Sequence, residues 1–146
     1  MSVEPGIVDA NILIYALDTE APQHEACRTL LEAAQGEAPT TTLYVTLQIL
    51  CEFYAIVTNA RRVLKPRTSA AALTAISEML GFLRVLPVPV FAIDELMALL
   101  RRRPVTGGDI FDLQIIATMK LNGISRIYTF NTDDSKPFAE IEPLTP

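Results

Sequence analysis

Short apolar runs of strand-like composition alternate with longer helical patterns along this chain, and that alternation most constrains its fold. Strands that alternate with helices form a parallel sheet covered on both faces. We therefore expect residues 1–146 to form a single α/β domain, a three-layer α/β/α sandwich around a central parallel sheet.

The expected elements follow from periodicity, caps and turn residues. The sequence predicts strands over residues 6–8, 40–45, 126–130 and 141–144, and at most a short strand in the proline-interrupted run 85–90. It predicts helices over residues 12–17, 22–34, 46–58, 69–83, 94–103 and 109–122, capped at Asn11, Thr46 and Ser69 where these side chains open a helix.

The composition is that of a folded, acidic domain. The 146 residues carry a formal net charge of −5, and half of them are hydrophobic. A surface that coats nucleic acid is normally basic, so attraction for phosphate must come from a local basic patch or from bound cations. No basic, apolar leader opens the chain and no apolar run approaches a membrane span, which favours a cytoplasmic protein without a membrane partner.

Four segments place an acidic residue where an apolar run meets a boundary. Asp9 follows the first strand and Asp133 follows the strand 126–130. Glu52 lies within a helix, and Asp112 lies in the first turn of another. The carboxyl ends of parallel strands share one edge of the sheet, where ligands bind. The sequence therefore brings several of these acids toward one edge.

Most of these acids also have an ordinary structural explanation. Asp9 can cap the turn after its strand, Asp112 can favour its helix dipole, and Asp133 can belong to a polar turn. Glu52 fits that account less easily, because unpaired glutamate is rarely buried among apolar neighbours. Converging carboxylates repel one another, and a divalent cation relieves that repulsion. Oxygen ligands without a His/Cys set favour Mg²⁺ or Mn²⁺ over zinc, and the number of ions stays open.

Four motifs, in this order, resemble those of the PIN-domain family, and nearly the whole chain is similar to the VapC-type toxins of bacterial and archaeal toxin–antitoxin pairs. The motifs are Ile7-Val8-Asp9-Ala10-Asn11, Gln48-Ile49-Leu50-Cys51-Glu52-Phe53-Tyr54, Asp112-Leu113-Gln114-Ile115-Ile116-Ala117 and Thr129-Phe130-Asn131-Thr132-Asp133. The resemblance implies a metal-dependent endoribonuclease in which Asp9, Glu52 and Asp112 are the catalytic metal ligands and Asp133 completes the acidic set. It also implies an RNA substrate, a VapB-like antitoxin partner and a homodimer.

The final motif departs from the family pattern. Many relatives have aspartate where this chain has Asn131, so the fourth ligand is Asn131, Asp133 or a water held by them. An amide oxygen can ligate a cation but brings no charge. Thr46, Thr129 and Asn11 lie near the expected strand ends and are candidates to orient ligands or water.

One basic segment is a candidate RNA contact. Arg61, Arg62, Lys65 and Arg67 could guide an RNA backbone near the cleft, and a solvated loop explains them equally well. The main alternative function is a catalytically weak or inactive PIN-like domain that binds RNA or a protein, and Asn131 keeps it open. A phosphoacceptor receiver domain is disfavoured because the run 85–90 contains no aspartate. No glycine-rich turn or nucleophile elbow supports a Rossmann enzyme or a serine hydrolase.

Overall fold

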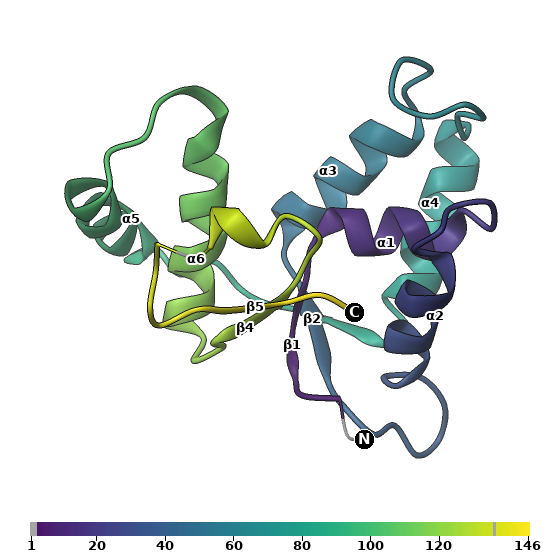
Figure 1. The fold of residues 1–146 in the computed structure, drawn as a ribbon, viewed down its shortest axis with the longest axis horizontal. Helices are drawn as coiled ribbons and strands as arrows, with labels where there is room; N and C mark the ends of the chain where they lie inside the picture. Colours follow the sequence, from purple (N-terminus) through teal and green to yellow (C-terminus); the bar gives the residue numbers. More distant parts are fainter. Residues whose placement is uncertain (1–2, 136) are drawn as a thin grey trace.

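The fold is a five-stranded parallel sheet between two layers of helices, seen in a computed structural model that describes residues 3–135 and 137–146 (Figure 1). The strands are β1 (Gly6–Val8), β2 (Leu43–Val45), β3 (Leu83–Val85), β4 (Arg126–Tyr128) and β5 (Glu142–Leu144). Their order in the sheet is β3-β2-β1-β4-β5, and every neighbouring pair is parallel. The expected parallel sheet is confirmed.

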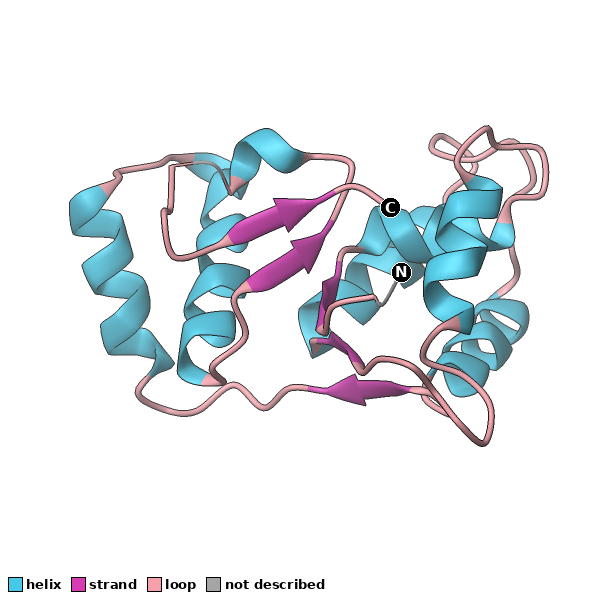
Figure 2. Cartoon of the chain, turned by 60° about the horizontal axis from the view of Figure 1, so that its bottom comes forward, coloured by secondary structure: helices cyan, strands magenta, loops and turns pink. Residues whose placement is uncertain are grey.

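Six α-helices in the described part of the chain form the outer layers. They are α1 (Ala10–Leu17), α2 (His24–Glu32), α3 (Leu47–Val57), α4 (Ser69–Met79), α5 (Ala92–Arg102) and α6 (Ile110–Leu121). Helix α1 packs against α2 and α3, and α3 packs against α4, whereas α5 packs against α6. Figure 2 shows the strands between these two groups, which confirms the three-layer sandwich. Among the described residues, no helix has the length and apolar character needed to cross a bilayer.

The central strand β1 fixes where the candidate site lies. Ile7 and Val8 are fully buried between β2 and β4. A Cβ on Gly6 would lie 2.9 Å from the carbonyl oxygen of Arg126, so this close approach of β1 and β4 requires glycine. The carboxyl ends of β1 and β4 therefore lie side by side, and the residues that follow them meet there.

Two of the three expected helix caps are corrected by the structure. Thr46 does cap α3, because its hydroxyl oxygen accepts a hydrogen bond from the Ile49 N–H at 3.2 Å. Helix α1 is capped by Asp9 and not by Asn11, since the Asp9 carboxylate accepts from the Ala10 N–H at 2.7 Å. Thr68, and not Ser69, caps α4.

The third strand lies earlier than expected. Helix α4 ends at Met79, and β3 covers Leu83–Val85 instead of falling within 85–90. Pro87 and Pro89 have no N–H to donate, so the ladder to β2 ends with the bond from Leu86 N–H to the Val45 carbonyl. Helices α2 and α5 begin at His24 and Ala92, where the sequence predicted starts near residues 22 and 94. These shifts leave the topology unchanged.

Candidate active site

A cleft of about 880 Å³ opens at the carboxyl ends of β1 and β4 and runs along α1. Its wall includes Asp9, Glu52, Asp112 and Asn131, which come from four segments far apart in the sequence. The position is the one at which open parallel sheets bind ligands. Three of the four acids singled out in the sequence therefore share one cleft.

Asp9 is held by hydrogen bonds to both of its carboxylate oxygens. Oδ1 accepts from the Ala10 N–H at 2.7 Å, and Oδ2 accepts from the Thr129 hydroxyl at 2.8 Å. The Asp9 backbone N–H donates to the Tyr128 carbonyl at 3.0 Å, which continues the pairing of β1 with β4. The side chain is half-buried and its orientation is defined before any ligand binds.

Thr129 is the centre of a small hydrogen-bond network beneath Asp9. Its side chain is buried, and its hydroxyl oxygen accepts from Asn11 Nδ2 at 3.3 Å and from the Asn131 N–H at 3.0 Å. The hydroxyl thus uses its one donor and both acceptor positions. Asn11 and Thr129 lie where the sequence placed supporting residues, whereas Thr46 caps α3 and does not line the cleft.

Glu52 and Asp112 approach the cleft from two helices of opposite layers. Glu52 is half-buried on α3, and its Oε1 accepts from Gln48 Nε2 at 3.1 Å. Asp112 is half-buried in the first turn of α6, whose following residues Ile115 and Ile116 are buried. These two helices thus bring their carboxylates to the cleft from opposite faces of the sheet.

Next to the carboxylates lies a recess of about 20 Å³ with both polar and apolar walls. The polar residues that line it are Asp9, Asp112, Thr129, Asn131 and Ser135. A space of this size is close to what one water molecule occupies. Ser135 is buried and was not anticipated from sequence, because a serine after an Asp-rich turn carries no distinctive signal.

Comparison with known proteins identifies the family. The family model of the PIN domain matches residues 6–142. The chain belongs to the PIN domain family. No curated protein matches the chain in sequence.

Solved structures with the same fold share little sequence with this PIN domain. VapC20 from Mycobacterium tuberculosis, described as a sarcin–ricin loop cleaving toxin, superposes with a TM-score of 0.65 at 20% identity, covering 94% of this chain and 98% of that one. VapBC2 from Rickettsia felis, bound to a promoter DNA fragment, superposes with a TM-score of 0.63 at 15% identity, and the match covers 98% of each chain. A toxin–antitoxin complex from Klebsiella pneumoniae superposes with a TM-score of 0.62 at 18% identity, covering 94% of this chain and 95% of that one. These likenesses establish the fold.

Besides Thr46, two further sequence candidates lie apart from the cleft of this PIN domain. Asp133 is exposed in the 3₁₀ turn Thr132–Asp134 and does not line the cleft, whereas Asn131 lines both the cleft and the recess. Arg61 also lies outside the cleft lining. Whether Asn131 or Asp133 is the fourth ligand thus stays a prediction. The cleft geometry favours Asn131, because only Asn131 of the two lines the cleft.

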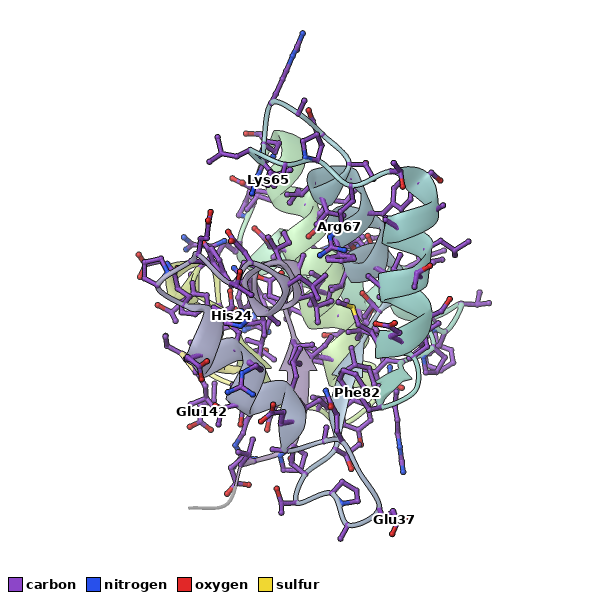
Figure 3. All side chains as sticks on the ribbon, turned by 90° about the vertical axis from the view of Figure 1, so that its right-hand side faces the viewer. His24, Glu37, Lys65, Arg67, Phe82 and Glu142 are labelled. Atoms are coloured by element: carbon purple, nitrogen blue, oxygen red, sulfur yellow. The ribbon has the colours of Figure 1, made fainter. Side chains whose placement is uncertain are left out.

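The loop between α3 and α4 supplies the basic wall. Arg62, Lys65 and Arg67 line the cleft. Figure 3 shows Lys65 and Arg67 at the top of the molecule, on the side away from Glu37. The acidic side chains of the cleft outnumber these cations, since Asp18 and Glu20 also line its outer end. A phosphodiester that enters this cleft meets excess negative charge unless a cation is bound.

The donor set fits a hard divalent cation. All the polar side chains around the recess offer oxygen atoms, and the cleft lining includes no histidine or cysteine. Within the described ranges, no three Asp, Glu, His or Cys side chains lie close enough together to ligate one ion directly.

Proposed function

We propose that this PIN domain is a metal-dependent endoribonuclease that hydrolyses RNA phosphodiester bonds, and that it is the toxin of a VapBC-type toxin–antitoxin pair. The observation that carries the proposal is the meeting of Asp9, Glu52 and Asp112 in one cleft with a basic loop on its wall. The structural similarity to VapC20, a toxin described as cutting the sarcin–ricin loop, also supports the proposal of a ribonuclease toxin.

Asp9, Glu52 and Asp112 would hold Mg²⁺ or Mn²⁺, part of this set through the waters that the ion keeps, with Asn131 as a neutral fourth ligand and Asp133 as the alternative. A divalent cation held there would neutralise charge on the phosphate and lower the pKa of the attacking water. Thr129 holds Asp9 in place through its 2.8 Å hydrogen bond. Glu52 or Asp112 accepts the proton of the attacking water. Arg62, Lys65 and Arg67 bind neighbouring phosphates of the strand.

The proposed protein partners are a VapB-like antitoxin and a second copy of the chain. Solved relatives include VapBC complexes from Rickettsia felis and Haemophilus influenzae. Exposed apolar side chains gather at the start of α5, at Val90, Phe91, Ile93 and Met97, and offer a surface of the kind that partners cover. Light scattering of the purified protein, alone and with the antitoxin from a neighbouring gene, tests both partnerships.

RNA cleavage tests the proposal directly. The protein should cut RNA when Mg²⁺ or Mn²⁺ is added and stop when EDTA is present. Asp9→Asn should lower the cleavage rate by at least about 100-fold because it removes one charge from the ligand set. The matched control Asp18→Asn makes the same change at the outer end of the cleft and should leave the rate near that of the wild type.

Two results would overturn this assignment. Equal cleavage by Asp9→Asn and wild type would remove Asp9 from the active site. RNA binding without any cleavage, in both metals and with both structured and single-stranded RNA, would favour a PIN-like binding domain, the alternative that the uncharged Asn131 supports.

A further inference from the structure

Gln48 connects the two helices that carry Glu52 and Asp112. It lies one helical turn before Glu52 in α3, and its Nε2 donates to Glu52 Oε1 at 3.1 Å. The same nitrogen donates to the backbone carbonyl of Phe111 at 3.3 Å, directly before Asp112. One side-chain amide therefore links the two proposed ligands that come from opposite layers.

Its two partners determine the orientation of the Gln48 amide. A carboxylate oxygen and a backbone carbonyl oxygen both accept hydrogen bonds, so the NH₂ group must face them and use one hydrogen for each. The amide oxygen then points the other way, where it is buried and has no hydrogen-bond partner among the described residues. Leaving a buried oxygen unsatisfied is unfavourable, and an apolar side chain of this size would avoid that cost. The hydrogen bonds to Glu52 and Phe111 therefore explain why glutamine, and not an apolar residue, occupies this position.

We propose that Gln48 is a positioning residue that sets the separation of Glu52 and Asp112 for the metal ion; the inference rests on the proposed function. Glutamine suits this role because it donates a hydrogen bond to Glu52 Oε1 and is itself neutral. A lysine or arginine at this position would add a positive charge and compete with the cation for the carboxylate. Residues that orient metal ligands in this way commonly contribute about 10–100-fold to metal affinity or activity.

Calorimetric titration with Mn²⁺ tests the metal role of Gln48. Gln48→Leu keeps the side-chain size and the helix-forming tendency but removes both donors. Its dissociation constant for Mn²⁺ should be about 10–100-fold higher than that of the wild type. Gln35→Leu, the same change at an exposed position outside the cleft, should bind like the wild type. Cleavage by Gln48→Leu should need more Mg²⁺ and approach the wild-type rate when Mg²⁺ is in excess.

Hydrogen exchange of the metal-free protein tests the link between the helices independently. Amides in the first two turns of α6 should exchange faster in Gln48→Leu than in wild type and in Gln35→Leu. Wild-type Mn²⁺ affinity in Gln48→Leu would overturn the metal role of Gln48 while leaving the ribonuclease proposal intact. A wild-type protein that binds no Mn²⁺ would instead overturn the proposed function, and unchanged exchange in α6 would overturn the link itself.

Discussion

The inner and outer ends of the cleft are built in different ways. At the inner end, Asp9 is fixed through both carboxylate oxygens and rests on the buried Thr129. At the outer end, the loop between α3 and α4 is held at its base by local backbone bonds, such as Arg67 N–H to the Val57 carbonyl at 2.7 Å. Leu64 near its tip is almost fully exposed.

This difference matches the two tasks that the proposed function requires. Chemistry on a phosphate depends on groups held in the correct geometry before the substrate arrives. Attraction between cationic side chains and a flexible RNA backbone acts at longer range and tolerates movement of the loop. We therefore expect changes at the inner end to affect the rate of cleavage, and changes at the outer end to affect RNA affinity.

Of three changes that leave the carboxylates of the cleft intact, the largest effect is expected from Thr129→Val, which alters the inner end. The variant keeps the shape of the side chain but removes its hydrogen bonds to Asp9, Asn11 and Asn131. Cleavage should fall about 10–100-fold. The free energy of unfolding should fall by about 1–3 kcal/mol, because buried groups are left without their partners.

Urea denaturation and single-turnover cleavage measure both effects of Thr129→Val. Thr74→Val on the exposed side of α4 is the matched control and should change stability by less than about 0.5 kcal/mol. Wild-type cleavage by a folded Thr129→Val protein would show that the network beneath Asp9 is not needed for catalysis.

An intermediate effect is expected when positive charge is removed from the outer end. The double variant Arg62→Ala with Lys65→Ala should raise KM for RNA and leave kcat near that of the wild type. The slope of log affinity against log salt should become shallower by about 1 for each phosphate that no longer pairs with a cationic side chain. Arg101→Ala, an exposed arginine outside the cleft, should leave both quantities unchanged. A fall in kcat with unchanged KM would contradict the assignment of RNA binding to the outer end and of chemistry to the inner end.

The smallest effect concerns stability away from the cleft. Arg102 donates hydrogen bonds to Glu140 and, with Lys120 nearby, lowers the pKa of Glu140 from 4.5 to about 2. Because the folded-state pKa is depressed, the stabilisation is present above pH 4.5 and is lost as the pH falls toward 2. Glu140 is partly exposed, so its contribution is about 1 kcal/mol or less.

Unfolding at several pH values measures the contribution of Glu140. Glu140→Gln should be slightly less stable than wild type at pH 7, and the difference should shrink as the pH falls through this range. Its RNA cleavage at pH 7 should match the wild type, because Glu140 does not line the cleft. A loss of cleavage in Glu140→Gln would mean that the layer of α5 and α6 controls the site more closely than the structure indicates.

Sequence patterns predicted the topology well because burial imposes it. The apolar runs that form β1 and β4 have few alternatives to a place in the sheet, and the helical stripes had to cover its faces. Boundaries were less predictable, since Asp9 and Asn11 are both residue types that cap helices well, and only the structure shows that Asp9 is the cap. The exact start of β3 depends on its pairing with β2, which no local pattern reveals.

The candidate site was predictable in part for the same reasons. Asp9 and Asn131 follow strands, so their convergence could be inferred from parallel topology alone. The bond from Gln48 to Phe111 joins residues 63 apart in the sequence, and the buried position of Ser135 depends on how the final turn folds back. Such long-range contacts leave no periodic signal in the chain.

The central claim is that a divalent cation binds at the inner end of the cleft, and paramagnetic line broadening by Mn²⁺ in NMR spectra tests it most directly. We predict that low concentrations of Mn²⁺ broaden the amide signals of Asp9, Glu52, Asp112 and Asn131 first, and that Asp9→Asn removes this effect. Broadening centred on the outer acids Asp18 and Glu20, with the signals of Asp9 and Asp112 left sharp, would contradict the account.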